Sequence, residues 1–196
     1  MVAASSTMQI LGSAAHAFEL PDTAPEKIST NTLVSLSGYA EQPLLLMFIC
    51  NHCPFVVHVI EPLVALANSA QRQGFAVVAI CANDVQAYPQ DSPENMAIFA
   101  QRYGFEFPYC YDQSQTVAKA YGAACTPDFF IYDRAHKLQY RGQMDASRPG
   151  NDVIPDGADL NAAIDSVLNN TPLTKEQVPS IGCGIKWSPG NQPDYC

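Results

Sequence analysis

Apolar residues along the chain form two kinds of run, and the two kinds alternate. The stretches LLLMFI (residues 44–49) and FAVVAICA (residues 75–82) are apolar without alternation, as expected for strands covered on both faces of a sheet. Each is followed by apolar residues at helical spacing. These are Val56, Val57, Ile60, Leu63, Val64 and Ala67 after the first run, and Met96, Phe99, Ala100 and Tyr103 after the second. The pattern therefore predicts two successive strand–helix units.

Residues with known preferences for helix ends support both helices. Ser92 followed by Pro93 predicts the start of the second helix, because a serine hydroxyl caps free N–H groups and proline suits the first helical position. Gly104 is the expected stop. The first helix is expected over residues 53–71 with a kink at Pro62, since proline removes a hydrogen bond inside a helix.

Shorter runs complete the expected order of elements. Brief segments rich in β-branched or aromatic residues and bounded by turn residues predict strands. They lie at residues 18–22, 33–38, 107–111, 128–133 and 137–142. The first two form an N-terminal β-hairpin extension, and the last two are joined by a tight turn. Asp112 is expected to cap a helix that ends at Gly122, and a closing helix carries an apolar stripe between Leu160 and Leu168.

This order predicts one α/β domain with a central mixed sheet flanked by helices. Alternating strands and helices imply a parallel core, and the final strand–strand–helix segment adds an antiparallel edge. A chain of 196 residues with 47% hydrophobic composition can fill one core. We expect the domain over residues 1–170. The tail, residues 171–196, is rich in proline and without period, so we expect it to be irregular and to pack back on the domain.

Composition and charge narrow the possible partners. The chain has 10 basic against 19 acidic residues, a formal net charge of -9, and no basic block. Nucleic acid is therefore not expected, because binding its phosphates needs clustered positive charge. No run of about 18 apolar residues is present, so no membrane segment is expected. The first residues lack the pattern of a secretory signal, and we expect a cytoplasmic protein.

The chain contains seven cysteines, an odd number. Most lie inside apolar runs and are not spaced like a disulfide scaffold, so mostly reduced thiols are expected. Cys50 and Cys53 are the exception, because they stand two residues apart in the sequence CNHC at the first strand–helix junction. In α/β sheets, reactive groups gather where strands turn into helices.

The CNHC sequence suits electron exchange. At a helix N-terminus Cys50 would be favoured as a thiolate, and a protonated His52 would lower its pKa further. Cys53, one turn later, could attack a mixed disulfide formed on Cys50. A metal-binding module stays open as an alternative. A structural zinc site lacks its second pair of ligands, but a copper-type site of both cysteines and a histidine fits the softness of thiolate ligands.

A second feature lies far along the chain, in ACTPDFFIYD. Pro127 stands at the start of a predicted strand, where proline lacks a donor for the ladder. A cis Thr126–Pro127 bond would bring the Thr126 carbonyl to the cysteines, as a docking edge for an extended polypeptide or thiol substrate. Cys125 would then be a third redox thiol or a packing residue. We interpret Cys183, in the tail sequence GCG, as a packing contact between glycine turns, with a resolving or capping thiol as the alternative.

Together these segments resemble the thioredoxin-like superfamily and, within it, the redoxin group related to alkyl hydroperoxide reductase and thiol-specific antioxidant proteins. The matching residues are FELPD, LLLMFICNHCP, FAVVAI, Tyr121-Gly122, and Thr126-Pro127 followed by FFIYD. The resemblance implies a thioredoxin-like fold and a thiol–disulfide oxidoreductase with antioxidant activity and no bound cofactor. Its partners would be a protein or small-molecule thiol or disulfide and an electron donor that the sequence does not identify.

The resemblance also implies roles for individual residues. Cys50 is the attacking thiol, Cys53 the resolving thiol and Pro127 the cis proline, while His52 holds a position that tunes reduction potential in related oxidoreductases. The strand before the pair carries no buried acid, unlike that of thioredoxin, so Asp128 is our candidate for proton transfer. Cys50 holds the place that peroxiredoxins give to a threonine, a departure that counts against peroxide reduction. Peroxide reduction, with Cys53 as the attacking thiol, is the third hypothesis.

Overall fold

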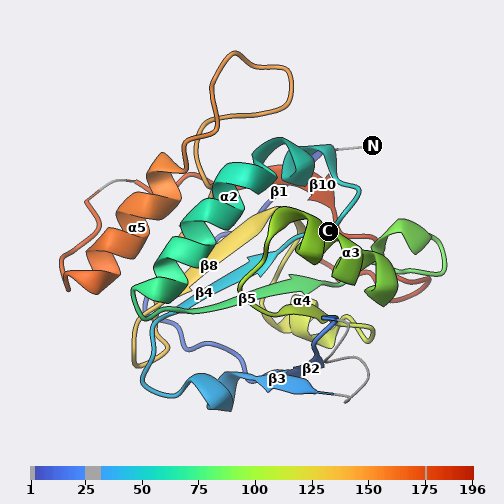
Figure 1. The fold of residues 1–196 in the computed structure, drawn as a ribbon, viewed down its shortest axis with the longest axis horizontal. Helices are drawn as coiled ribbons and strands as arrows, with labels where there is room; N and C mark the ends of the chain where they lie inside the picture. Colours follow the sequence, from blue (N-terminus) through green and yellow to red (C-terminus); the bar gives the residue numbers. More distant parts are fainter. Residues whose placement is uncertain (1–2, 25–31, 175) are drawn as a thin grey trace.

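The central sheet has five strands in the order β6-β5-β4-β8-β9 (Figure 1). The computed structural model describes residues 3–24, 32–174 and 176–196. The strands of the sheet are β4 (Leu44–Phe48), β5 (Ala76–Cys81), β6 (Tyr109–Tyr111), β8 (Asp128–Tyr132) and β9 (Leu138–Gly142). β4, β5 and β6 pair in parallel, whereas β8 and β9 add two antiparallel strands. The predicted mixed sheet with a parallel core and an antiparallel edge is confirmed.

Helices cover both faces of this sheet. They are α2 (Pro54–Arg72), α3 (Pro93–Tyr103), α4 (Thr116–Ala120) and α5 (Ala158–Leu168), with short 3-10 turns η1 (Leu36–Tyr39) and η2 (Pro89–Asp91). Figure 1 shows α2 and α5 along one face and α4 on the other. Ser92 caps α3 by accepting from the Asn95 N–H, and Gly104 ends it in the left-handed conformation, as predicted. Among the described residues, no helix is long and apolar enough to cross a bilayer.

The strand β4 forms the centre of the core, because all five of its residues are buried. Successive side chains of a strand point to opposite faces. Leu45 and Met47 pack with α2 and α5 on one face. Leu44, Leu46 and Phe48 pack with α4 and with the N-terminal hairpin on the other face. The absence of alternation in LLLMFI thus reflects a strand with apolar cover on both sides.

Two smaller sheets flank the core. The N-terminal hairpin is confirmed as β2 (Glu19–Pro21) paired with β3 (Leu33–Ser35), and residues 25–31 of its connection lie outside the described residues. The other sheet has the order β1-β10-β7, formed by β1 (Ala3–Ser5), β10 (Ile181–Gly184) and β7 (Cys125–Thr126). The tail expected to be irregular therefore contributes a strand. β10 packs between two segments that are distant in sequence, a pairing that local periodicity does not encode.

The start of one helix differs from the expectation. The helix α4 begins at Thr116, and Gln115 is its N-cap. Asp112 instead accepts the Ala118 N–H at 2.8 Å, so its carboxylate satisfies a donor of the first turn from three residues before the cap. Pro62 lies inside the helix α2.

A buried ion pair joins β8 to β9 on the face of the sheet opposite α2. The Arg141 guanidinium donates to the Asp128 carboxylate at 3.0 Å and to the Gly122 carbonyl at 2.7 Å, and both charged side chains are fully buried. The guanidinium also lies 4.4 Å from the centre of the Phe130 ring. Breaking a buried pair is costly, since the remaining charge loses its partner without gaining water.

We therefore expect Arg141→Met to lower the free energy of unfolding by about 3 kcal/mol, as measured by urea denaturation. Arg72→Met is the matched control, because the Arg72–Glu106 ion pair is exposed on both sides. Exposed pairs contribute about 0–1 kcal/mol, so this control should change stability little. Equal effects of the two substitutions would contradict the assignment of Arg141 as a stabilising buried partner.

Candidate active site

The two cysteines of CNHC lie in the turn between β4 and α2. Cys53 is the N-cap of α2 and Pro54 is its first residue. The expectation that Cys50 occupies the helix N-terminus, with Cys53 one turn later, is therefore wrong. Proline is suited to the first helical position, and it disfavours helical backbone in the residue before it. Cys53 accordingly has extended backbone angles, and the helix cannot start earlier.

Thr126 brings the two sulfurs together with the other half of the predicted site. The Thr126–Pro127 peptide bond is cis, as predicted. Cys50 Sγ lies 3.4 Å from Thr126 Oγ1. Cys53 Sγ lies 3.1 Å from the Thr126 carbonyl oxygen and donates to it when protonated. All seven cysteines of the chain are free thiols in the structure, which therefore represents the reduced state.

The cysteine pair is buried from solvent. The exposed fraction of Cys50 is 1% and that of Cys53 is 0%. Burial raises a thiol pKa, because it penalises the charged form. A thiolate at this site thus depends on hydrogen-bond donors from the protein.

Those donors converge on Cys53. Its pKa is lowered to about 5, first by a hydrogen bond from the Cys50 thiol and then by donors at Cys183, Thr126 and the Val56 backbone, against the opposing effect of burial. The pKa of Cys50 is raised well above its ordinary value, chiefly because its proton is held between the two sulfurs. When Cys53 is ionised it no longer donates to the Thr126 carbonyl. The thiolate expected on Cys50 is therefore favoured on Cys53.

A carboxylate that sequence reasoning missed anchors the CNHC turn. Asp91 is fully buried, and its Oδ1 accepts the Asn51 N–H at 2.8 Å. Its Oδ2 lies 2.7 Å from His52 Nδ1 and accepts from the Asn83 amide at 2.8 Å. The His52 ring also stacks on Tyr88, with centroids 5.5 Å apart and planes 8° apart. Asp91 stands just before the Ser-Pro helix start, and its position gives no signal that the chain folds it back under the turn.

The Asp91 carboxylate has electrostatic effects on the site. Its hydrogen bond raises the pKa of His52 and so favours the imidazolium. Its charge adds to the raised pKa of Cys50. A cationic His52 attracts a thiolate on Cys53, so the ring between the cysteines favours the charge distribution described above.

Asp128 does not take the position expected for proton transfer to the thiols. Its carboxylate pairs with Arg141. The neighbouring residue Phe129 packs on the α2 face of the sheet, and alternation places the Asp128 side chain on the opposite face. Burial raises the Asp128 pKa to about 6, with the Arg141 charge opposing this rise. Its surroundings match those of a structural ion pair.

Two further thiols, Cys183 and Cys125, lie close to the cysteine pair but differ in their contacts. Cys183, on β10, stands directly opposite Thr126 in the β10–β7 ladder, and its thiol lowers the pKa of Cys53. The interpretation of Cys183 as a plain packing contact of the tail is therefore incomplete. Cys125 donates to backbone carbonyls of Pro127 and Ser180, with sulfur–oxygen distances of 3.7 and 3.9 Å. Its contacts are those of a packing residue.

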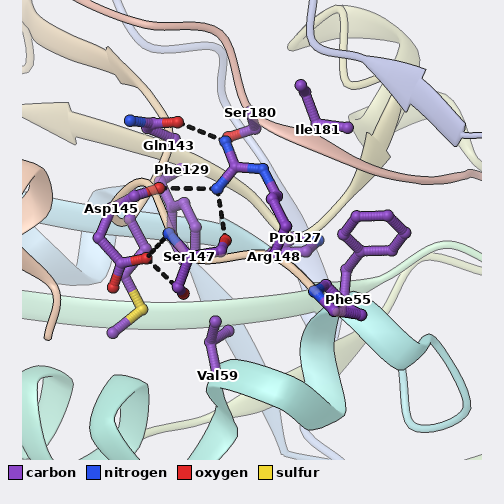
Figure 2. A pocket seen from close by; sticks show the side chains of 12 residues that line it. Phe55, Val59, Pro127, Phe129, Gln143, Asp145, Ser147, Arg148, Ser180 and Ile181 are labelled. Atoms are coloured by element: carbon purple, nitrogen blue, oxygen red, sulfur yellow. Dashed lines mark hydrogen bonds between the residues drawn. The ribbon is translucent and has the colours of Figure 1, made fainter. Parts of the chain in front are cut away.

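A groove adjoins Pro127 and the first turn of α2 (Figure 2). Apolar side chains form one part of its lining, and Arg148 stands beside them. The Arg148 guanidinium donates to the backbone carbonyls of Asp145 and Ser147 at 2.7 and 2.6 Å, and to the Gln143 side-chain carbonyl. Among the described residues, no carboxylate forms an ion pair with it. The apolar residues are Phe55, Val59, Pro127, Phe129 and Ile181.

One combination of side chains could also hold a metal. Ligand atoms of Cys50, His52 and Asp91 lie within 4.8 Å of one another. Sulfur, imidazole and carboxylate together suit a borderline cation such as zinc or a soft one such as copper. However, both carboxylate oxygens of Asp91 already accept hydrogen bonds from Asn51 and Asn83, so a bound ion would compete with the contacts that hold the turn.

Comparisons with known proteins find solved structures with the same overall fold. The chain is similar to an uncharacterized conserved protein from Geobacillus kaustophilus, with 48% identity, a TM-score of 0.91, and coverage of 97% of this chain and 98% of that one. A hypothetical protein from Sinorhizobium meliloti 1021 is also 48% identical, with a TM-score of 0.89 and coverage of 95% and 99%. A search of curated proteins finds no match.

Structures with lower sequence identity identify the fold. The thioredoxin domain of a thiol-disulfide oxidoreductase from Bacteroides vulgatus has a TM-score of 0.61 at 16% identity, with coverage of 83% of this chain and 100% of that one. The fold is thus thioredoxin-like, as the sequence resemblance implied. The model of the AhpC/TSA family matches residues 11–141, about two thirds of the chain. With its cysteine pair, its cis proline and this match, the chain belongs to the AhpC/TSA family.

Proposed function

We propose that the protein is a thiol–disulfide oxidoreductase that cycles Cys50 and Cys53 between dithiol and disulfide without a bound cofactor. One observation carries the proposal: both sulfurs contact Thr126, the residue before the cis proline. Membership of the AhpC/TSA family supports an oxidoreductase role. The cysteine pair supplies a nucleophile and a resolving thiol, and the proline loop holds both sulfurs through Thr126.

The hydrogen bonds favour Cys53 as the attacking thiol, the reverse of the roles implied by sequence resemblance. The Cys53 thiolate attacks one sulfur of a disulfide substrate, forms a mixed disulfide and releases the first substrate thiolate. Cys50 then attacks Cys53 Sγ, and its proton passes to the second departing thiolate. The substrate disulfide gains two electrons and the cysteine pair becomes a disulfide. An external thiol restores the dithiol by the reverse exchange.

The groove beside Pro127 is the proposed docking place for the substrate. It extends from the first turn of α2 to Ile181 of β10 and includes the cis proline, Pro127. All three contacts of the Arg148 guanidinium are to neutral oxygen acceptors, so its charge is available to an anionic group. We therefore propose disulfides that carry a carboxylate as the preferred small substrates.

A metal-binding function is the second candidate, and the grouping of Cys50, His52 and Asp91 favours it. In this case Cys50, with His52 and Asp91, would hold a soft cation instead of exchanging electrons. The two functions differ in a measurable way: thiol exchange needs only a disulfide, whereas metal binding gives a stoichiometric ion in protein purified without chelator.

We expect Cys53→Ser to reduce the rate of exchange with an aromatic disulfide reporter to that of free solution thiols, because the substitution removes the proposed nucleophile. The measurement is release of the coloured thiolate, in a Cys196→Ser background, since Cys196 is the exposed cysteine. Cys110→Ala is the matched control, because Cys110 is a buried thiol on β6, in the core on the opposite face from α2.

This control should exchange at the rate of the background protein. An undiminished rate in Cys53→Ser would overturn the proposed function. A stoichiometric metal ion that blocks the reporter, and that is lost in the Cys50→Ser/Cys53→Ser variant, would favour the second candidate.

We expect Cys50→Ala to raise the pKa of Cys53 from about 5 toward the ordinary cysteine value of roughly 8.5, because the Cys50 thiol is the first of the donors that lower it. Cys50→Ser keeps a donor at this position and should raise the pKa less. Alkylation of Cys53 followed by mass spectrometry across pH measures both. The alkylation rate then rises with pH at a higher midpoint in the alanine variant. Equal midpoints in the two variants would contradict the proposed hydrogen bond.

We expect Arg148→Gln to raise KM about tenfold for a disulfide that carries carboxylates, because one charge-assisted contact contributes roughly 1.4 kcal/mol or more. Steady-state kinetics with a neutral disulfide of similar size is the internal control, and its KM should stay unchanged. A similar loss for both substrates would indicate a structural role for Arg148.

A further inference from the structure

The strand β10 occupies the edge that an extended substrate was expected to use. It pairs antiparallel with β7, and the register places Cys183 opposite Thr126 and Gly184 opposite Cys125. Figure 1 shows β10 beside the N-terminal end of α2. The backbone next to the cis proline is therefore already paired with a segment of the same chain, and that segment carries a cysteine.

The register of β10 places Cys183 beside Cys53. Cys183 stands opposite Thr126, whose carbonyl oxygen lies 3.1 Å from Cys53 Sγ. The Cys183 thiol lowers the pKa of Cys53, and the Phe55 N–H opposes the rise in the pKa of Cys183. Both thiols are almost completely buried. Cys53 therefore has two thiol neighbours, Cys50 from its own turn and Cys183 from the tail.

Gly182 explains how the tail approaches so closely. A Cβ at this position would lie 1.9 Å from the Thr126 carbonyl oxygen and 2.6 Å from its carbon, so another residue forces a shift of backbone. A Cβ at Gly184 would meet only ordinary contacts, the nearest at 3.8 Å. The first glycine of the GCG sequence thus permits close approach of two backbones, and the turn predicted for it is absent because residues 181–184 form a strand.

We propose that Cys183 is a third catalytic thiol, which resolves disulfides on Cys53 by forming a Cys53–Cys183 bond. The inference rests on the proposed function and extends it. Cys183 as thiolate attacks Cys53 Sγ, either in a mixed disulfide with substrate or in the Cys50–Cys53 disulfide. The bond from Cys53 to its former partner breaks, and that partner leaves as a thiolate, which takes up the proton that Cys183 lost when it ionised. No oxidant beyond the substrate disulfide is consumed, because each step is an exchange.

The protonation state of Cys183 depends on whether Cys53 carries a negative charge. In the dithiol, burial and then the hydrogen bond and charge of Cys53 raise the pKa of Cys183 to about 12, so Cys183 stays protonated and supports the Cys53 thiolate. Once Cys53 is part of a disulfide, its negative charge is gone. Lys186 and the Phe55 N–H both favour the Cys183 thiolate. Formation of a disulfide on Cys53 therefore lowers the pKa of Cys183 and favours the thiolate that attacks this disulfide.

The test uses the full chain in the Cys196→Ser background. Cys50→Ser leaves Cys183 as the expected resolving thiol. On addition of the aromatic disulfide reporter, this variant should release one coloured thiolate as Cys53 reacts and a second as Cys183 resolves the mixed disulfide. Peptide mapping without reduction should then find a Cys53–Cys183 bond. Cys50→Ser/Cys183→Ser should stop after the first release and keep the reporter on Cys53.

Two glycine variants test the role of position without removing any sulfur. In the Cys50→Ser protein, Gly182→Ala should displace β10 from Thr126 and slow the second release at least tenfold. Gly184→Ala, which meets no close contact, should leave it unchanged. The Cys196→Ser protein with Cys50 intact provides an independent test. After partial oxidation, peptide mapping without reduction should find a Cys53–Cys183 disulfide in addition to the Cys50–Cys53 disulfide.

The outcomes separate the two proposals. A second release that persists without Cys183, or a reporter that stays on Cys53 while Cys183 is intact, would overturn the role of Cys183 and leave the proposed function standing. Absence of any release attributable to Cys53 would overturn both. Circular dichroism shows whether Cys50→Ser folds. If it does not fold, peptide mapping of the Cys196→Ser protein tests the inference instead, and absence of a Cys53–Cys183 disulfide there would overturn it.

Discussion

The register between β4 and β8 is the constraint on which the whole site depends. The antiparallel ladder ends with Phe48 opposite Asp128. Continued by two residues, the same register places Cys50 opposite Thr126, and these residues are in contact. A slip of one residue would reverse the face of every side chain on the strand. It would also separate the cysteines from the proline loop. The register that packs the β4 side chains into the core on both faces therefore also assembles the site.

Burial gives the site much of its chemistry. Water is largely excluded from both sulfurs of the pair, so the charge of a thiolate is balanced by the few donors that surround it. Those donors are unequally distributed, and Cys53 receives more of them than Cys50. A CxxC sequence alone gives no such asymmetry. It arises because Pro54 delays the start of α2 until after Cys53, and because the tail brings a third thiol to the same sulfur.

The two buried acids near the site have different functions in the fold. Asp128 balances Arg141 on the far face of the sheet, where both groups are removed from water. Asp91 supports the CNHC turn, through the Asn51 N–H and the His52 ring. The acid adjacent in sequence to the cis proline is thus part of the scaffold, whereas an acid 38 residues beyond Cys53 acts on the electrostatics of the pair. Neighbouring side chains on a strand point to opposite faces of the sheet, and this alternation explains why Asp128 points away from the cysteine pair.

The sequence by itself determined the order of the strands and helices of the central sheet, the buried strands and the caps of α3. These features depend on local preferences and on the periodicity of apolar residues, which a single chain displays directly. Only the tertiary structure decided which sulfur carries charge, which acid supports it, and that β10 places Cys183 against Cys53. Each of these depends on contacts between segments distant in sequence, whose free energy comes from packing and desolvation and leaves no periodic pattern in the residues themselves.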